Sequence, residues 1–240
     1  LQTATVVGPD GEEVHPDEHG RVKVQFHWDR SEPFDETSSC WVRVSQLWAG
    51  NGWGTMFIPR IGHEVLVDFI EGDPDRPVVT GRVYTGDNKP PYALPDEKTK
   101  STIKSDSSIG GGGFNELRFE DNKGSEQIFL HAQKDYDEKV LNNHTEDVGV
   151  HETITIGANQ DTTIGANKTM HVKGNFDEKV DGTETRTVTG AVDETFLASE
   201  TRNITADQSE TIGGSVTRTI SGSVTETISG SVTQTISGSS

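Results

Sequence analysis

An eight-residue repeat occupies the second half of the chain and constrains its fold more than any other feature. Residues 216–223, 224–231 and 232–239 repeat one string almost unchanged. The same frame runs back without a gap to Tyr136, which gives thirteen octads between 136 and 239. A fixed short period is the signature of a repeat architecture, in which units that cannot bury a core alone pack on their neighbours.

Two positions of the octad are restricted. The fifth is apolar in every octad, and the seventh is glycine or alanine except at Asn142 and Val150. We expect the fifth-position side chains to point inward: Val140, Val148, Ile156, Ile164, Val172, Val180, Val188, Phe196, Ile204, Ile212, Ile220, Ile228 and Ile236. We expect the glycines at the seventh position to form corners of the repeat: Gly174, Gly182, Gly190, Gly214, Gly222, Gly230 and Gly238.

Eight residues suffice for one short strand and one corner, and the abundant Thr, Val and Ile favour extended backbone. One inward aliphatic residue per strand is too thin a core for one chain. If three chains wind together, three aliphatic side chains meet at each level and every strand pairs with a neighbouring chain. The repeat therefore predicts an intertwined triple-stranded β-helix, a prism built by a homotrimer, about 60 Å long at roughly 4.8 Å per strand.

The third octad position conflicts with simple alternation, which would place it inward beside the fifth. Charged residues occupy it in most octads, for example Glu178, Arg186 and Glu194. Burying such charges without partners is costly. Either this position lies near a prism edge, or Glu and Arg pair between chains.

Residues 1–96 have a different pattern. Short runs rich in Val, Ile and aromatic residues alternate with Gly, Pro and Asp turns, and no helical period occurs. The runs that we expect to be strands are 3–7, 21–28, 41–45, 64–70 and 77–84. Within 21–28, Val22, Val24, Phe26 and Trp28 share one face. Five short strands in this length predict a five-stranded OB-fold barrel.

The segment between these regions is short. It holds a glycine run at 110–113 and two alternating runs at 115–120 and 127–131. The glycine run lacks the following Lys-Ser/Thr of a phosphate-binding loop and is interpreted as a flexible turn. We therefore expect an all-β chain with a barrel at 1–96, a neck at 97–135 and the octad helix at 136–240.

Charge and composition exclude several partners. The net charge is −18, which disfavours nucleic acid and anionic membranes. Trp48 and Trp53 could stack on bases, but the basic groove that single-strand binding needs is missing, so these residues are assigned to the core or to a protein contact. The lone Cys40 can form no disulfide within the chain and is expected to be buried. The first residues do not form a signal peptide.

No catalytic, cofactor or metal site emerges. His15 and His19 could clamp a metal on a helix, but Pro16 and Gly20 indicate a loop. Asp73 and Asp75 flank Pro74 and are interpreted as turn residues, not as a pair of catalytic carboxylates. We expect no enzyme activity and no cofactor.

Several strings resemble one known family. Residues 20–30, 40–46, 59–65, 72–77 and 114–120 look like VgrG, the spike protein of bacterial type VI secretion systems, and the octads continue the likeness. The octads are also similar to those of the phage tail cell-puncturing protein, where Val-x-Gly stands in place of Ile220 to Gly222. The phage protein carries a lysozyme domain between barrel and helix. Here only about 40 residues separate the two, which is too few for such a domain.

The resemblance implies a non-enzymatic homotrimeric spike that pierces target-cell envelopes and carries effectors. It also implies a tube protein at the base, a tip-sharpening protein and effectors at the far end, and purely mechanical contact with the target membrane. Such a spike would assemble in the bacterial cytoplasm and leave without a signal peptide for the extracellular space or a target cell. The alternative is the shaft of a phage tail spike or fibre, or of a trimeric adhesin, although a shaft would not need the barrel strings.

Overall fold

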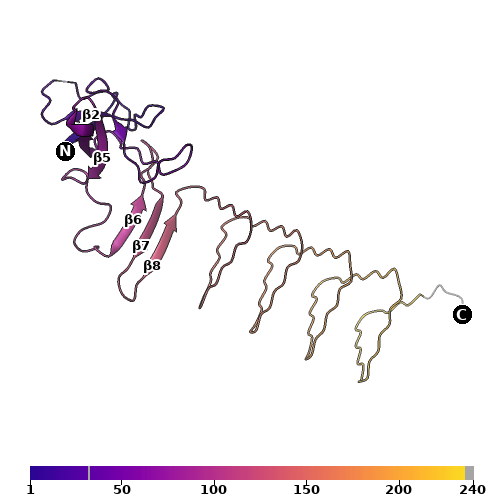
Figure 1. The fold of residues 1–240 in the computed structure, drawn as a ribbon. Helices are drawn as coiled ribbons and strands as arrows, with labels where there is room; N and C mark the ends of the chain where they lie inside the picture. Colours follow the sequence, from indigo (N-terminus) through magenta and orange to yellow (C-terminus); the bar gives the residue numbers. More distant parts are fainter. Residues whose placement is uncertain (32, 236–240) are drawn as a thin grey trace. The chain divides into compact units, whose positions relative to one another are not determined.

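The computed structural model describes residues 1–31 and 33–235, and its contacts divide the chain into two units, Leu1–Thr153 and Ile154–Ser240 (Figure 1). No α-helix occurs among the described residues, so none of them form a helix long and apolar enough to cross a membrane. The elements are β1 (Gln2–Val7), β2 (Lys23–Phe26), β3 (Arg43–Val44), β4 (Glu64–Phe69), the 3₁₀ helix η1 (Ile70–Gly72), β5 (Pro77–Val83), β6 (Lys100–Lys104), β7 (Glu116–Glu120) and β8 (Gln127–His131). The expected all-β class is confirmed.

The first five strands form one curled sheet in the order β2-β1-β4-β5-β3. Neighbours are antiparallel except β3 and β5, and a register shift between Leu66 and Val67 leaves one extra residue, Thr80, in β5. Val22 and Val42 exchange backbone hydrogen bonds of 3.0 and 2.8 Å, which brings the two ends of the sheet order together. Bulges and end-to-end pairing are the devices by which a small sheet curls into a barrel.

Valine dominates the core of this sheet because the inward residues of successive strands alternate with outward ones. The buried cluster consists of Ala4, Val6, Val22, Val24, Val42, Val65, Val67 and Val79. Each of the five strand runs expected from the sequence overlaps one observed strand, with differences at the ends. A core of β-branched side chains suits strands, since these side chains lose little freedom on a pleated backbone.

The exposure of Trp28 and Cys40 corrects the sequence analysis. Trp28 was placed on one face with Val22, Val24 and Phe26, but its strand ends at Phe26 and its ring is 63% exposed. The ring is stacked on Phe26, and its indole Nε1 lies 2.5 Å from Gln2 Oε1. Gln25, on the opposite face from Val24, is instead only 1% exposed. Cys40 is exposed because it lies in the loop before β3. Alternation predicts the faces of a strand but not where the strand ends.

Strands β6, β7 and β8 form a second, antiparallel sheet in that order. The runs expected at 115–120 and 127–131 correspond to β7 and β8. Strand β6 was not predicted, because its string of Lys100, Ser101, Thr102, Ile103 and Lys104 contains a single aliphatic residue.

An ion pair joins the neck to the barrel. The Arg60 guanidinium contacts the Glu13 carboxylate and donates a hydrogen bond of 2.6 Å to the backbone carbonyl of Asp106. The backbone N–H of Ile109 donates to the other Glu13 oxygen at 3.0 Å. Both charged side chains are about three-quarters covered, at 26% and 24% exposure. This Arg60 clamp fixes the loop that follows β6 against the barrel.

One face of the second sheet carries a polar network centred on Glu116, which is only 3% exposed. Its carboxylate accepts hydrogen bonds from the Tyr92 hydroxyl and, at 2.9 Å, from the Thr102 hydroxyl. Burial acts to raise the pKa of Glu116, but these hydrogen bonds and the charges of Lys104 and Arg118 outweigh it, so the pKa lies below its ordinary value of 4.5. The ionised form is therefore the one that stabilises the fold.

We predict that Glu116→Gln lowers the thermal unfolding midpoint at neutral pH. A depressed carboxyl pKa contributes stability above the unfolded value and loses it as pH falls through the folded value. The gap between wild type and variant should therefore be largest above about pH 5 and should narrow below the ordinary value of 4.5. Circular dichroism melting across this range measures it, with Asp10→Asn at an exposed turn as the control. A gap that does not depend on pH would contradict the assignment.

Candidate functional site

The described residues of the octads, 136–235, are all exposed, and their backbone repeats the same local course from octad to octad (Figure 1). Two-residue bends recur every eight residues, from 133–134 to 229–230, and six extended residues separate successive bends. The bends fall at the sixth and seventh octad positions. The backbone thus changes direction with the same eight-residue period as the sequence.

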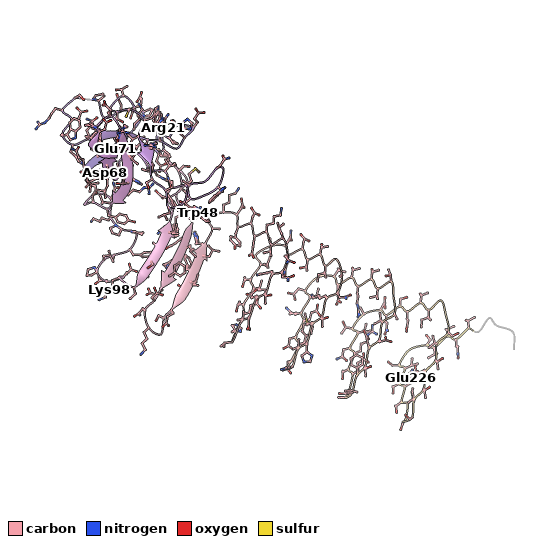
Figure 2. All side chains as sticks on the ribbon, in the orientation of Figure 1. Arg21, Trp48, Asp68, Glu71, Lys98 and Glu226 are labelled. Carbon is pink, nitrogen blue, oxygen red and sulfur yellow. The ribbon has the colours of Figure 1, made fainter. Side chains whose placement is uncertain are left out.

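The fifth-position side chains are exposed in every octad that the structure describes. Their exposed fractions range from 42% at Ile204 to 58% at Phe196, while Ile236 lies outside the described residues. Figure 2 shows the side chains of this part, including that of Glu226, projecting from the trace. The aliphatic column predicted to point inward therefore finds no cover within one chain.

The backbone of this part is equally without partners. Between 132 and 235 no backbone–backbone hydrogen bond joins two of the described residues. Extended backbone usually pairs its N–H and C=O groups in a ladder. A row of such unpaired groups is a template for strands of other chains.

The seventh-position glycines lie in the bends, apart from Gly238, which is outside the described residues. None of those described has a left-handed φ, and a Cβ added at any of them would meet nothing within 4 Å. Alanine accordingly occupies the same position at Ala158, Ala166, Ala198 and Ala206. Within one chain, the described bends do not themselves require glycine.

A second uncovered apolar surface lies on the three-stranded sheet, opposite the Glu116 network. The pairings of Ile103 with Leu117, Leu117 with Leu130, and Phe119 with Ile128 place these five side chains on one face. Four of them are exposed, from 40% at Phe119 to 71% at Ile128. The alternation in the two predicted runs, 115–120 and 127–131, already places four of these five residues on common faces. Ile103 could not be included because β6 was not predicted.

A third apolar surface is the barrel loop 47–57. Trp48 and Trp53 pack edge to face with ring centroids 4.9 Å apart, yet they are 64% and 58% exposed. Leu47 and Met56 are exposed beside them in the sequence, at 89% and 79%. The expected core role of these tryptophans is therefore wrong, and a protein contact is the interpretation that remains. An exposed apolar cluster of this kind is typical of an interaction surface.

The residues that were considered for metal binding or catalysis make structural contacts instead. His15 packs against Trp41 with the rings tilted and their centroids 5.2 Å apart, while His19 Nε2 lies 3.6 Å from Glu18 Oε1. Asp73 accepts hydrogen bonds of 3.0 Å from the Asp75 backbone and the Arg76 side chain, as a turn residue does. Across the described part of the chain, no group of three His, Cys, Asp or Glu is placed to hold a metal ion.

Two known protein families match the chain. The type VI secretion system/phage-baseplate injector OB domain matches residues 2–84, and the bacteriophage T4 gp5 C-terminal trimerisation domain matches residues 101–200. The first match covers the curled five-stranded sheet, and the second covers the three-stranded sheet and the octads up to residue 200. The OB-fold expected from the sequence is therefore confirmed.

The curated relatives carry spike names. The type VI secretion system spike protein VgrG1b of Pseudomonas aeruginosa is 59% identical over 157 residues, which are 65% of this chain and 21% of that protein. Spike protein VgrG3 of Vibrio cholerae is 56% identical over 153 residues, or 64% and 15%. The actin cross-linking toxin VgrG1 of V. cholerae is 55% identical over 153 residues, or 64% and 14%. The matches span about a fifth or less of these relatives, and they confirm the resemblance stated from the sequence.

We predict that Gly222→Ala leaves the thermal melting of the protein unchanged, because the bend has an ordinary φ and open space for a Cβ. Gly11→Ala is the matched control. It also has open space, but its φ of 82° is left-handed, so the substitution should cost about 1 kcal/mol or more. Equal losses in the two variants would show that the bend needs glycine after all.

Proposed function

We propose that this chain, a relative of the VgrG spike proteins of type VI secretion systems, forms a homotrimeric cell-puncturing spike. In this proposal residues 1–96 form the barrel, 97–135 the neck and 136–240 an intertwined β-helix of three copies. Each level of the helix brings together three fifth-position side chains, one from each copy. The glycines and alanines of the seventh position stand at the edges of the prism.

The observation that carries the proposal is the lack of any partner for the octads within one chain. Their aliphatic column is exposed and their backbone makes no ladder among the described residues. Burial of each Val or Ile side chain is worth about 1.5–3 kcal/mol, so the column represents a large stabilisation that only association can supply. The match to a trimerisation domain supports three copies as the number.

The apolar face of the three-stranded sheet extends the same argument to the neck. Ile103, Ile128 and Leu130 are each more than half exposed, and they lie in the stretch that matches the trimerisation domain. We propose that this face packs against the corresponding faces of the other two copies. The Glu116 network on the opposite face then points away from the axis.

We propose a mechanical role for this stretch, without catalysis or a cofactor. The relative that is named a toxin shares a segment amounting to 14% of its own length, so its name refers to a far longer protein. The spike would meet a tube protein at its base, and a tip-sharpening protein and effectors at its far end. It would assemble in the bacterial cytoplasm and be expelled by the secretion machine to the extracellular space or a target cell.

The first experiment is the solution mass of the protein by light scattering. We expect three times the chain mass of 26.1 kDa, unchanged on dilution, because all strand pairing in the helix lies between copies. A well-folded monomer would overturn the proposal.

The inward assignment of the fifth position is tested by Ile212→Asp. Three carboxylates would then meet near the axis without cationic partners, so we expect the trimer to be lost or to melt at a clearly lower temperature. Thr211→Asp adds the same charge at the neighbouring, outward position and should trimerise normally. If Ile212→Asp forms a trimer with unchanged melting, the fifth position does not face the axis.

A further inference from the structure

The third octad position carries an alternating charge. From the sixth octad onward its sign changes at every repeat, through Glu178, Arg186, Glu194, Arg202, Glu210, Arg218 and Glu226. Gln234 follows in the last octad. We call these seven charged residues the charge column. A solvated surface has no reason to alternate strictly at a spacing of eight residues.

The alternation occurs where nothing else distinguishes one octad from the next. Residues 216–223, 224–231 and 232–239 are identical except at the third position, which holds Arg218, Glu226 and Gln234. Identical repeats pair equally well in any register that is shifted by whole octads. In this stretch only the charge column can tell the registers apart.

The structure places one pair of successive members of the column in contact. Arg186 Nη1 lies 3.2 Å from Glu194 Oε1, an ion pair that spans one octad. It is the one ion pair within the column among the described residues of a single chain. The other five charges are therefore available to neighbouring copies.

We propose that the charge column sets the register between copies of this chain in the distal helix. The inference rests on the proposed trimer, in which strands stacked on one face come from different copies, one octad apart in level. Aligned copies then place a Glu above and below each Arg. A copy shifted by one octad would put like charges next to each other along its whole length, and directly opposed like charges destabilise paired strands.

The position of the column along the chain fits this role. In the five octads before the column begins, the third position holds Glu138, Glu146, Ile154, Thr162 and Met170, so its charge does not alternate there. Those octads differ from one another at many positions and are nearest in sequence to the barrel and neck, so their register has other determinants. The alternation begins beyond them and continues to the octads that are otherwise identical.

The test uses a full-length chain in which the column is inverted. All seven signs are exchanged, Glu to Arg and Arg to Glu, and residues 1–177 stay unchanged. A tagged wild-type chain and the untagged inverted chain are expressed together, and the trimers are counted by native mass spectrometry. Tagged and untagged wild-type chains are expressed together as the control for free mixing.

We expect each chain to form trimers with itself and mixed trimers to be depleted strongly relative to the control. Inversion preserves the alternation within one kind of chain but places like charges at every contact between the two kinds. Mixed trimers at the control level, or above it, would overturn the register proposal while leaving the trimer itself intact. Failure of the wild-type chain alone to trimerise would instead overturn the proposed function on which it rests.

Discussion

The lack of backbone partners within one chain is the constraint on which the described residues of the octad region depend. An extended segment of this length, with its aliphatic side chains exposed and no ladder among its described residues, has almost nothing to stabilise it as a single chain. Conformational entropy opposes its ordering at every residue. In the proposed assembly, folding and association of this region are therefore one event, and the stability of the helix depends on protein concentration.

The barrel is built by the opposite principle. Its strands pair within the chain, and valines such as Val24 and Val65 are fully covered by other residues of the same chain. This part can fold before any partner arrives. The three-stranded sheet lies between these extremes, since its strands pair within the chain and its Glu116 face carries a hydrogen-bonded network, while its apolar face is open.

The sequence predicted what repeats and missed what is unique. The octad period and the runs around Val24, Val65 and Val79 are visible because identical physical demands recur at fixed spacing. Strand β6 was missed because pairing with β7, and not hydrophobicity, makes it a strand. Trp28 and Cys40 were misplaced because strand ends depend on the closure of the sheet, which no local pattern encodes. The exposed loop of Trp48 and Trp53 could be recognised only once the core was seen to be filled by valine.

The Arg60 clamp determines how force would travel through the first unit. Without it, the hydrogen bonds that reach the second sheet from the preceding described residues would all come from the connecting residues 84–99. Arg60 and Glu13 form hydrogen bonds with the backbone of Asp106 and Ile109. A compressive force can therefore pass between the two sheets through these contacts as well as through the connecting residues. The clamp therefore restrains bending between the two sheets. Removing the Arg60 guanidinium would leave the connection between them free to bend.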